Sequence, residues 1–254
     1  MLEPVRLAKR LAEMQGCSRR EAEQYIESGF VTVDGVVVEE SQFRVGNQAI
    51  ALSPDASLLA QTAVTILLHK PAGYESRDAA HASGDAGVSI AAQLLTVANR
   101  SAIDRSGIKP LKKHFAASEL ATPLATAASG LVVFTEDWRV LRKLREDAKV
   151  LEHEVVVEVS GQIKPGGLER LNRQNRIGHG FVYNGTLLPP AKVSWQSEAR
   201  LRFALKGEVP GQIAYLCESV GLTVEAMKRL RVGRVPLSQL PPGQWRYLMP
   251  YERF

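Results

Sequence analysis

The dipeptide Asp34-Gly35 constrains the fold of this chain most tightly, because it separates two runs of alternating apolar residues, VTV and VVV. An Asp-Gly pair in this setting is the strongest short-range signal of a β-hairpin, since both residues of its tight turn need positive φ angles. The sequence therefore predicts a hairpin centred on residues 34 and 35.

Two short helices are predicted before this hairpin. The segment VRLAKRLAEM places Leu7, Leu11 and Met14 at helical spacing. The segment CSRREAEQYIESGF begins with Ser18 and has Glu21 three residues later, which is the pattern of a capping box. We therefore expect a compact helix–helix–hairpin domain over residues 1–61, ending in a linker of small and polar residues at 53–62.

Arg19 and Arg20 occupy the first turn of the second predicted helix. Free backbone N–H groups and the positive end of the helix dipole already lie there, so cations oppose helix stability and an anion such as an RNA phosphate would stabilise it. The alternative interpretation is two solvated arginines on a surface helix.

The remaining residues, 62–254, predict a larger α+β domain with a mixed or antiparallel sheet. Apolar runs predict strands at VTILLHK, LVVFTED, HEVVVEVSG, LRFAL, LTVEAMKRLRV and WRYLMP. Helices are predicted near residues 90–97, at DWRVLRKLREDAK and at GQIAYLCESVG. Pro71 and Gly73 predict a turn that projects Lys70.

Composition narrows the classes of function. No apolar run approaches the ~18 residues that span a bilayer, and two cysteines give no disulfide framework, so we expect a cytoplasmic protein without membrane association. Residues 1–61 hold six Lys/Arg and nine Asp/Glu, and residues 62–254 hold 26 and 18, giving net charges of −3 and +8. The basic balance of the second part suits a polyanionic partner.

No cofactor or metal is expected. The five histidines show no metal-ligand spacing, and the stretch from Gly84 to Gly87 lacks the following lysine and the strand–helix setting of a phosphate-binding loop.

The N-terminal segment RLAKRLAEMQGCSRREAEQYIESGFVTVDGVVV resembles the RNA-binding domain named after ribosomal small-subunit protein four. About thirty residues match its RL-x-x-x-L helix and its SRR-x-A-x-x-x-I-x-x-G-x-V-x-V-[ND]-G pattern in order. The resemblance implies RNA contacts from Arg6, Lys9, Ser18, Arg19 and Arg20.

The body resembles the bacterial rRNA pseudouridine synthase family, whose members carry the same N-terminal domain. HKPAGYES is similar to the family's nKPxG element, SGLVVFTEDW to the second half of GRLDxxTxGLLLLTND, and AMKRLRVGRVPLSQLPPGQWRYL to its C-terminal pattern. The resemblance implies the fold of these isomerases and a site built on the aspartate of GRLD, the carboxylate that the reaction needs.

The reaction-centre residues of that family are missing from this chain. The alignment places Ala125 at the aspartate, Pro123 at the arginine before it and Val155 at the tyrosine that packs against the target base. The family's usual threonine is Ala128. Near the C-terminal helix, Gln212 and Ile213 match, and the surrounding family arginines correspond to Gly211, Ala214 and Tyr215.

These losses predict a monomeric pseudoenzyme without catalytic residues that binds structured RNA, with rRNA or a ribosomal particle as the expected partner, in ribosome assembly or RNA regulation. We expect Arg142, Arg145, Arg229 and Arg231 to line a basic groove continuous with the N-terminal domain. One alternative is an active synthase with a rewired site, in which Glu119 or Asp104 replaces the aspartate. Another is a protein-interaction module whose cleft binds a peptide.

Overall fold

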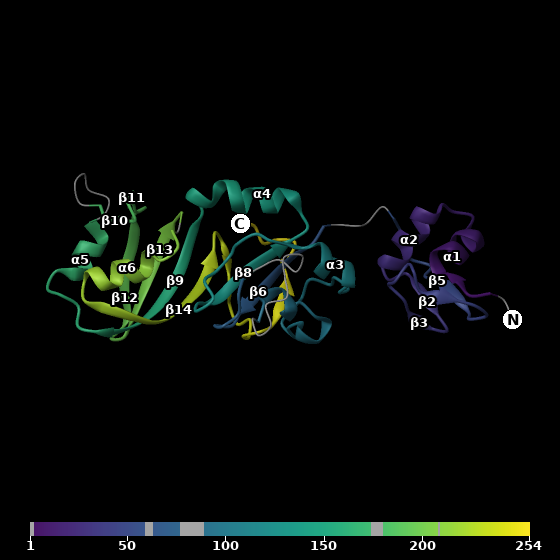
Figure 1. Cartoon of the computed structure of the whole chain (residues 1–254), viewed down its shortest axis with the longest axis horizontal. Helices are drawn as coiled ribbons and strands as arrows, with labels where there is room; N and C mark the ends of the chain where they lie inside the picture. Colours follow the sequence, from purple (N-terminus) through teal and green to yellow (C-terminus); the bar gives the residue numbers. More distant parts are fainter. Residues whose placement is uncertain (1–2, 59–62, 77–88, 174–179, 208) are drawn as a thin grey trace. The chain divides into compact units, whose positions relative to one another are not determined.

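The computed structural model describes residues 3–58, 63–76, 89–173, 180–207 and 209–254 (Figure 1). The chain divides into two compact units. The first comprises Met1–Ala63 and Ile108–Ala117, and the second comprises Val64–Gly107 and Ser118–Phe254. No helix in the described part of the chain is long and apolar enough to cross a membrane.

The first unit contains the predicted helices and hairpin. Helices α1 (Leu7–Gln15) and α2 (Arg19–Glu27) precede β2 (Val31–Val33) and β3 (Val36–Val37), and β5 (Ile50–Leu52) completes a sheet of order β3-β2-β5. Strand β1 (Val5–Arg6) pairs with β4 (Arg44–Val45). The apolar faces of these elements form one core, which includes Leu7, Leu11, Ala22, Ile26 and Val31.

Both local predictions for this unit are confirmed. Asp34 and Gly35 have φ angles of 50° and 80°, as the tight hairpin turn requires. The Ser18 hydroxyl accepts a hydrogen bond from the Glu21 N–H at 3.2 Å, and the Glu21 carboxylate accepts one from the Ser18 N–H at 2.8 Å. These two bonds satisfy backbone donors that the start of α2 would otherwise leave unpaired.

A segment from the middle of the chain belongs to the first unit. Helix α3 (Lys112–Ala117) follows Lys109, whose ammonium group donates to the Gly29 carbonyl at 3.1 Å. Lys112 donates its N–H to the Glu39 carboxylate at 2.7 Å, and Lys113 donates to the Ser28 hydroxyl at 3.1 Å. The sequence division assigned these residues to the second domain, because such a short helix carries little periodicity.

The second unit is built on a mixed sheet of order β12-β13-β9-β14-β8-β6-β16. The strands β8 and β14 are parallel, and the other neighbours on this path are antiparallel. The expectation of an α+β domain with a mixed sheet is confirmed. The strands are β6 (Thr65–Lys70), β8 (Ser129–Thr135), β9 (Glu152–Gly161), β12 (Ala191–Ser197), β13 (Arg200–Lys206), β14 (Leu222–Val232) and β16 (Trp245–Tyr247).

Shorter elements complete the second unit. Strand β7 (Glu119–Leu120) pairs with β8, β15 (Val235–Pro236) pairs with β14, and β10 (Val182–Tyr183) pairs with β11 (Thr186–Leu187). The predicted helix near residues 90–97 is instead two 3₁₀ turns, Ala91–Leu94 and Val97–Asn99. The sequence reading also missed α5 (Gly167–Asn172) and β12.

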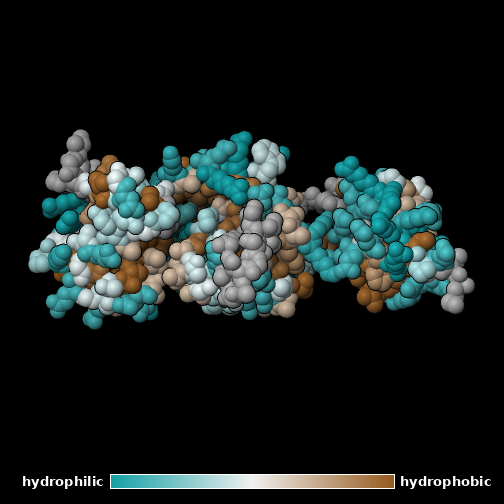
Figure 2. All heavy atoms as spheres, in the orientation of Figure 1, coloured by the Kyte–Doolittle hydropathy of each residue, from teal (hydrophilic) through white to brown (hydrophobic). Residues whose placement is uncertain are grey.

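Two apolar clusters hold the helices of the second unit against the sheet. Helix α6 (Gln212–Ser219) and α5 contribute to a cluster with β9, β12 and β13, and Leu144 of α4 (Trp138–Glu146) belongs to a cluster with β6 and β8. The outer face of α4 is covered by hydrophilic residues (Figure 2).

Gly130 allows the close approach of β8 to β14. Its φ angle is 119°, and a Cβ atom at this position would collide with the backbone of Arg229. Only glycine adopts this conformation without strain, so the parallel pairing that carries Arg229 to the site depends on it.

Candidate functional site

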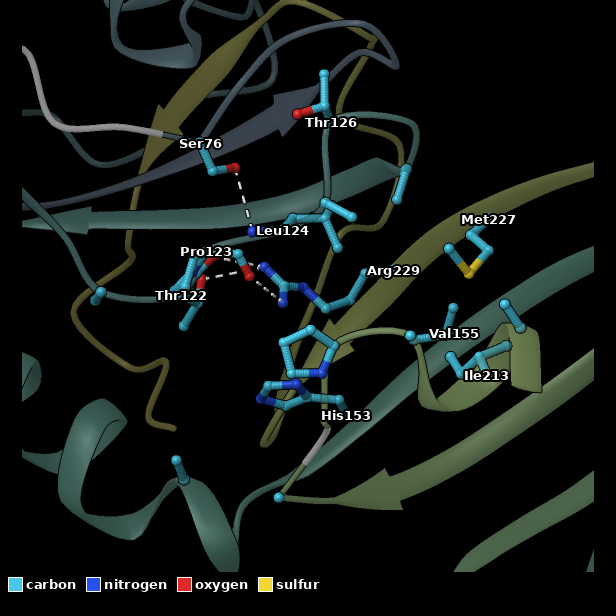
Figure 3. A pocket seen from close by; sticks show the side chains of 18 of the residues that line it. Ser76, Thr122, Pro123, Leu124, Thr126, His153, Val155, Ile213, Met227 and Arg229 are labelled. Atoms are coloured by element: carbon cyan, nitrogen blue, oxygen red, sulfur yellow. Dashed lines mark hydrogen bonds between the residues drawn. The ribbon is translucent and has the colours of Figure 1, made fainter. Parts of the chain in front are cut away.

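The second unit contains a cavity of about 500 Å³ between the loop of residues 121–128 and the strands β9 and β14 (Figure 3). The loop contributes Thr122, Pro123, Leu124 and Ala125 to its wall, and the start of α6 contributes Ile213. The positions that the sequence alignment assigned to the reaction centre therefore line one cavity.

Arg229 of β14 holds this loop through hydrogen bonds to its backbone. Its side chain is 2% exposed, and its Nε and Nη atoms donate to the carbonyl oxygens of Leu131 at 2.8 Å, Pro123 at 3.0 Å and Thr122 at 2.7 Å (Figure 3). The buried guanidinium thus satisfies two carbonyls of the loop and one of β8.

Lys70 holds the other end of the loop. It is fully buried, and its Nζ donates to the carbonyl oxygens of Tyr74 at 2.8 Å, Pro71 at 3.0 Å and Thr126 at 3.2 Å. Burial and the nearby Arg229 charge lower the pKa of Lys70 to about 8. The prediction that the turn projects Lys70 is wrong, because three carbonyl oxygens draw the side chain inward.

The predicted groove of four arginines is not what the structure shows. Arg229 is turned into the protein, and Arg231 is held by the carboxylates of Glu152 at 2.7 Å and Glu154 at 3.2 Å. Backbone carbonyl oxygens of β8 and of the loop before it thus bind Arg229, and two carboxylates of β9 bind Arg231. The ion pairs with Arg202 and Arg231 also hold the pKa of Glu154 below its usual value.

Arg142 and Arg145 lie on the exposed face of α4. Arg142 contacts Glu146 at 3.4 Å, and Arg145 contacts Glu119 at 3.3 Å, with all four side chains about half exposed or more. Both arginines thus remain available to a partner, but on a helix surface and not in a groove shared with Arg229 and Arg231.

Hydrocarbon side chains occupy the positions that the sequence alignment assigned to the family's reactive groups. Ala125, Pro123 and Val155 all line the cavity, and Val155 is almost fully buried between β13 and β14. A methyl, a pyrrolidine ring and an isopropyl group can exclude water from a ligand, but none can act as nucleophile, acid or base.

Aromatic residues pack beside the start of α6. Gly211 has a φ angle of 83°, and a Cβ atom there would lie 2.7 Å from the Tyr183 hydroxyl oxygen. The Tyr183 ring packs against Tyr215 with the centroids 5.0 Å apart. Gln212 is buried and donates to the Pro189 carbonyl at 2.9 Å. Tyr183 therefore occupies space that a long side chain at position 211 would need.

The two carboxylates considered as replacements lie elsewhere. Burial raises the pKa of Asp104, but hydrogen bonds from Ser106 and Arg100 outweigh that effect and lower it, so this carboxylate is a structural anion. Glu119 pairs with Arg145 on the surface. Neither lines the cavity.

Two polar residues that the sequence reading missed do line the cavity. Glu75 follows the turn after β6, and His153 lies near the start of β9 (Figure 3). The one sequence signal that could have indicated Glu75 is its place in HKPAGYES, the segment that resembles the family's nKPxG element.

The residues expected to contact RNA in the first unit are exposed. Arg6 precedes α1, Lys9 lies on α1, and Arg19 and Arg20 form the first turn of α2. Ser18 is exposed but its hydroxyl already caps α2, and Arg19 contacts Glu23 at 3.4 Å.

Within the described residues, no group of three His, Cys, Asp or Glu side chains could hold a metal ion. His81, His179 and the stretch 84–87 lie outside the described residues.

Comparisons with known proteins agree with this architecture. The model of the S4 domain matches residues 5–48. A protein described as an uncharacterized RNA pseudouridine synthase of Aquifex aeolicus is 26% identical over 251 residues, with 98% of this chain and 94% of that protein covered. The ribosomal small subunit pseudouridine synthase A of Vibrio cholerae is 26% identical, with 98% and 97% covered.

Other relatives support the same assignment. The dual-specificity RNA pseudouridine synthase RluF of Escherichia coli is 26% identical, with 96% of this chain and 75% of that protein covered. A crystal structure of a pseudouridylate synthase aligns with a TM-score of 0.59 at 17% identity, with 96% of each chain covered. The chain thus has an S4 domain at its N-terminus, a body with the pseudouridine synthase fold, and pseudouridine synthase homologues along nearly its whole length.

Proposed function

Because the chain joins an S4 domain to a pseudouridine synthase fold, we propose that it binds structured RNA without converting uridine to pseudouridine. Ribosomal RNA is the expected target, since one relative is described as a ribosomal small subunit synthase. A role in ribosome assembly or as an RNA-binding regulator in the cytoplasm follows from this target.

The lining of the cavity carries this proposal. Ala125, Pro123 and Val155 line one cavity of about 500 Å³, and the sequence alignment puts these three hydrocarbon side chains at the family's aspartate, arginine and tyrosine. The ribosyl centre of the substrate needs a carboxylate to trap or stabilise it. Arg229 and Lys70 hold the loop in shape through hydrogen bonds to its carbonyl oxygens.

The test is tritium release from uridine-labelled rRNA and from pre-ribosomal particles by the purified chain. We expect no release under conditions in which a related synthase works. Ala125→Asp is also expected to give no turnover, because Pro123 and Val155 still leave the target nucleotide unpositioned, and misplacement by about 1 Å can cost a hundredfold in rate. Stoichiometric pseudouridine formation by the unmodified chain would overturn the proposal.

One observation favours a second candidate, an active synthase with a rewired site. Glu75, whose side chain is a carboxylate, is one of the residues that line the same cavity. If the unmodified chain forms pseudouridine, Glu75→Gln should abolish the activity, because the amide cannot act as nucleophile or base. Glu119→Gln is the matched control, since Glu119 lies outside the cavity.

A further inference from the structure

Trp138 begins α4 and is the most exposed of the three tryptophans of this chain. Its side chain is 61% exposed, whereas that of Trp195 is 37% exposed and that of Trp245 is fully buried. The cap of α4 does not need the indole, because the Asp137 carboxylate accepts the Arg139 N–H at 2.8 Å. A single exposed aromatic residue is common on protein surfaces, so its neighbours decide its meaning.

Two guanidinium groups flank the indole ring. The Cζ atom of Arg139 lies 5.8 Å from the ring centroid, and that of Arg142 lies 5.6 Å from it. These distances are within the range of cation–π attraction, which holds the cations beside the ring. The platform, meaning Trp138 with Arg139 and Arg142, thus combines an indole that is 61% exposed with two positive charges.

The rest of α4 extends this positive charge. Residues 138–145 include Lys143 and Arg145 as well and contain no acidic residue. All four cations are exposed, because the opposite side of the helix packs Leu144 into the core. The pairs Arg142–Glu146 and Arg145–Glu119 are solvated, so they contribute little and can exchange for phosphates.

We propose that this platform on α4 binds an unpaired nucleotide of a single-stranded RNA segment, with its base stacked on Trp138 and its phosphates near Arg139 and Arg142. An indole face beside two guanidinium groups matches a nucleotide, which offers both a π-face and an anion. An acidic protein segment would satisfy the cations but leave the indole face without a matching group. The inference rests on the proposed RNA binding and adds a second RNA contact, away from the cavity.

Binding of the full chain to a 12-nucleotide oligouridylate, with a blunt 12-base-pair RNA duplex for comparison, tests the platform. Trp138→Ala should weaken binding to the oligouridylate about fivefold or more, from the loss of stacking. Trp138→Phe should retain most of the affinity, and the matched control Trp195→Ala should retain all of it. Binding to the duplex should change little in any of these variants, because its bases are already stacked.

The salt dependence of RNA affinity distinguishes the contribution of base stacking from that of phosphate contacts. Trp138→Ala should leave the slope of log K against log salt unchanged. Arg139→Gln with Arg142→Gln should reduce its magnitude by about 1.4, at roughly 0.7 per phosphate contact. Quenching of tryptophan fluorescence by the oligouridylate should be largely lost in Trp138→Phe and kept in Trp195→Phe.

Three outcomes would overturn the platform. Unchanged affinity of Trp138→Ala for the oligouridylate, while the unmodified chain binds RNA, would exclude this site alone. Equal binding of a 12-residue polyglutamate would assign α4 to an acidic protein partner. Failure of the unmodified chain to bind either RNA would overturn the proposed function and the platform together.

Discussion

The guanidinium of Arg229 is a cross-link inside the second unit. It joins β14 to the loop before β8 through the carbonyl oxygens of Thr122 and Pro123 and to β8 itself through that of Leu131, and it is almost completely buried. Hydrogen bonds to a charged group contribute more than neutral ones, and buried acceptors left without donors are costly. Arg229 therefore stabilises the cavity wall, and a contact with RNA is not needed to explain it.

Arg229→Ala should lower the free energy of unfolding by roughly 2–4 kcal/mol, because three buried carbonyls lose their donor. Arg231→Ala, two residues along the same strand, should cost less than about 1 kcal/mol, since its ion pairs are partly solvated. Urea denaturation measures both changes. RNA affinity should be the same in the two folded variants. A stable Arg229→Ala protein that no longer binds RNA would instead support the basic RNA-binding groove predicted from the sequence.

At the scale of elements, the loop of residues 121–128 is held between the ends of two strands. Lys70 at the end of β6 donates to Thr126, and Arg229 in β14 donates to Thr122 and Pro123. The Ser76 hydroxyl accepts the Leu124 N–H at 3.2 Å. These side chains hold the loop together with two backbone bonds, from the Gly73 N–H to the Thr126 carbonyl and from the Ala121 N–H to the Val133 carbonyl.

The lowered pKa of Lys70 predicts that the free energy of unfolding depends on pH. The pKa of Lys70 is about 8 in the folded chain and about 10.5 when it is unfolded, so between these values the unfolded state binds more protons. The free energy of unfolding should therefore rise from pH 8 to pH 10.5, by up to about 3 kcal/mol from this group.

Lys70→Met should lack this rise, so the stability difference between the unmodified chain and the variant should grow across the same pH range. Urea midpoints measured at intervals of pH give the comparison. Parallel curves for the two proteins would show that Lys70 does not titrate in this window. Lys192→Met, on the exposed part of β12, is a control for loss of an ordinary lysine.

At the scale of the whole molecule, charge is divided between the parts of the sequence. Residues 1–61 carry a net charge of −3 and residues 62–254 carry +8. In the first unit the cations Arg6, Lys9, Arg19 and Arg20 are exposed at the starts of α1 and α2. Residues 108–117 add three lysines and no acidic residue to this unit, which brings its formal net charge to zero, so an RNA site in it must be local, with the acidic residues outside the contact.

Arg19→Glu with Arg20→Glu should weaken binding to structured rRNA fragments broadly, without a preference for sequence, because phosphate contacts position RNA but do not specify it. The slope of log K against log salt should fall in magnitude by about 1.4. Arg200→Glu with Lys206→Glu on β13 is the control with an equal change of charge. Equal affinity of both double variants would remove the start of α2 from the RNA site.

Local chemistry is what the sequence determined by itself. The hairpin at Asp34-Gly35 and the capping box of Ser18 and Glu21 depend on neighbours within a few residues, so their patterns are complete in the sequence. The long strand β8 was predicted for a related reason, because a buried strand needs a continuous apolar run. The alignment also placed Ala125 and Val155, which line one cavity.

Only the tertiary structure decided where long polar side chains go. Arg229 and Lys70 look like solvated cations in the sequence, but their partners are backbone carbonyls that any residue supplies and that no motif marks. The place of Glu75 at the cavity and of residues 108–117 in the first unit likewise depends on contacts distant in sequence. Such contacts form when the whole chain packs, because burial forces each polar group to find whichever partner lies within reach.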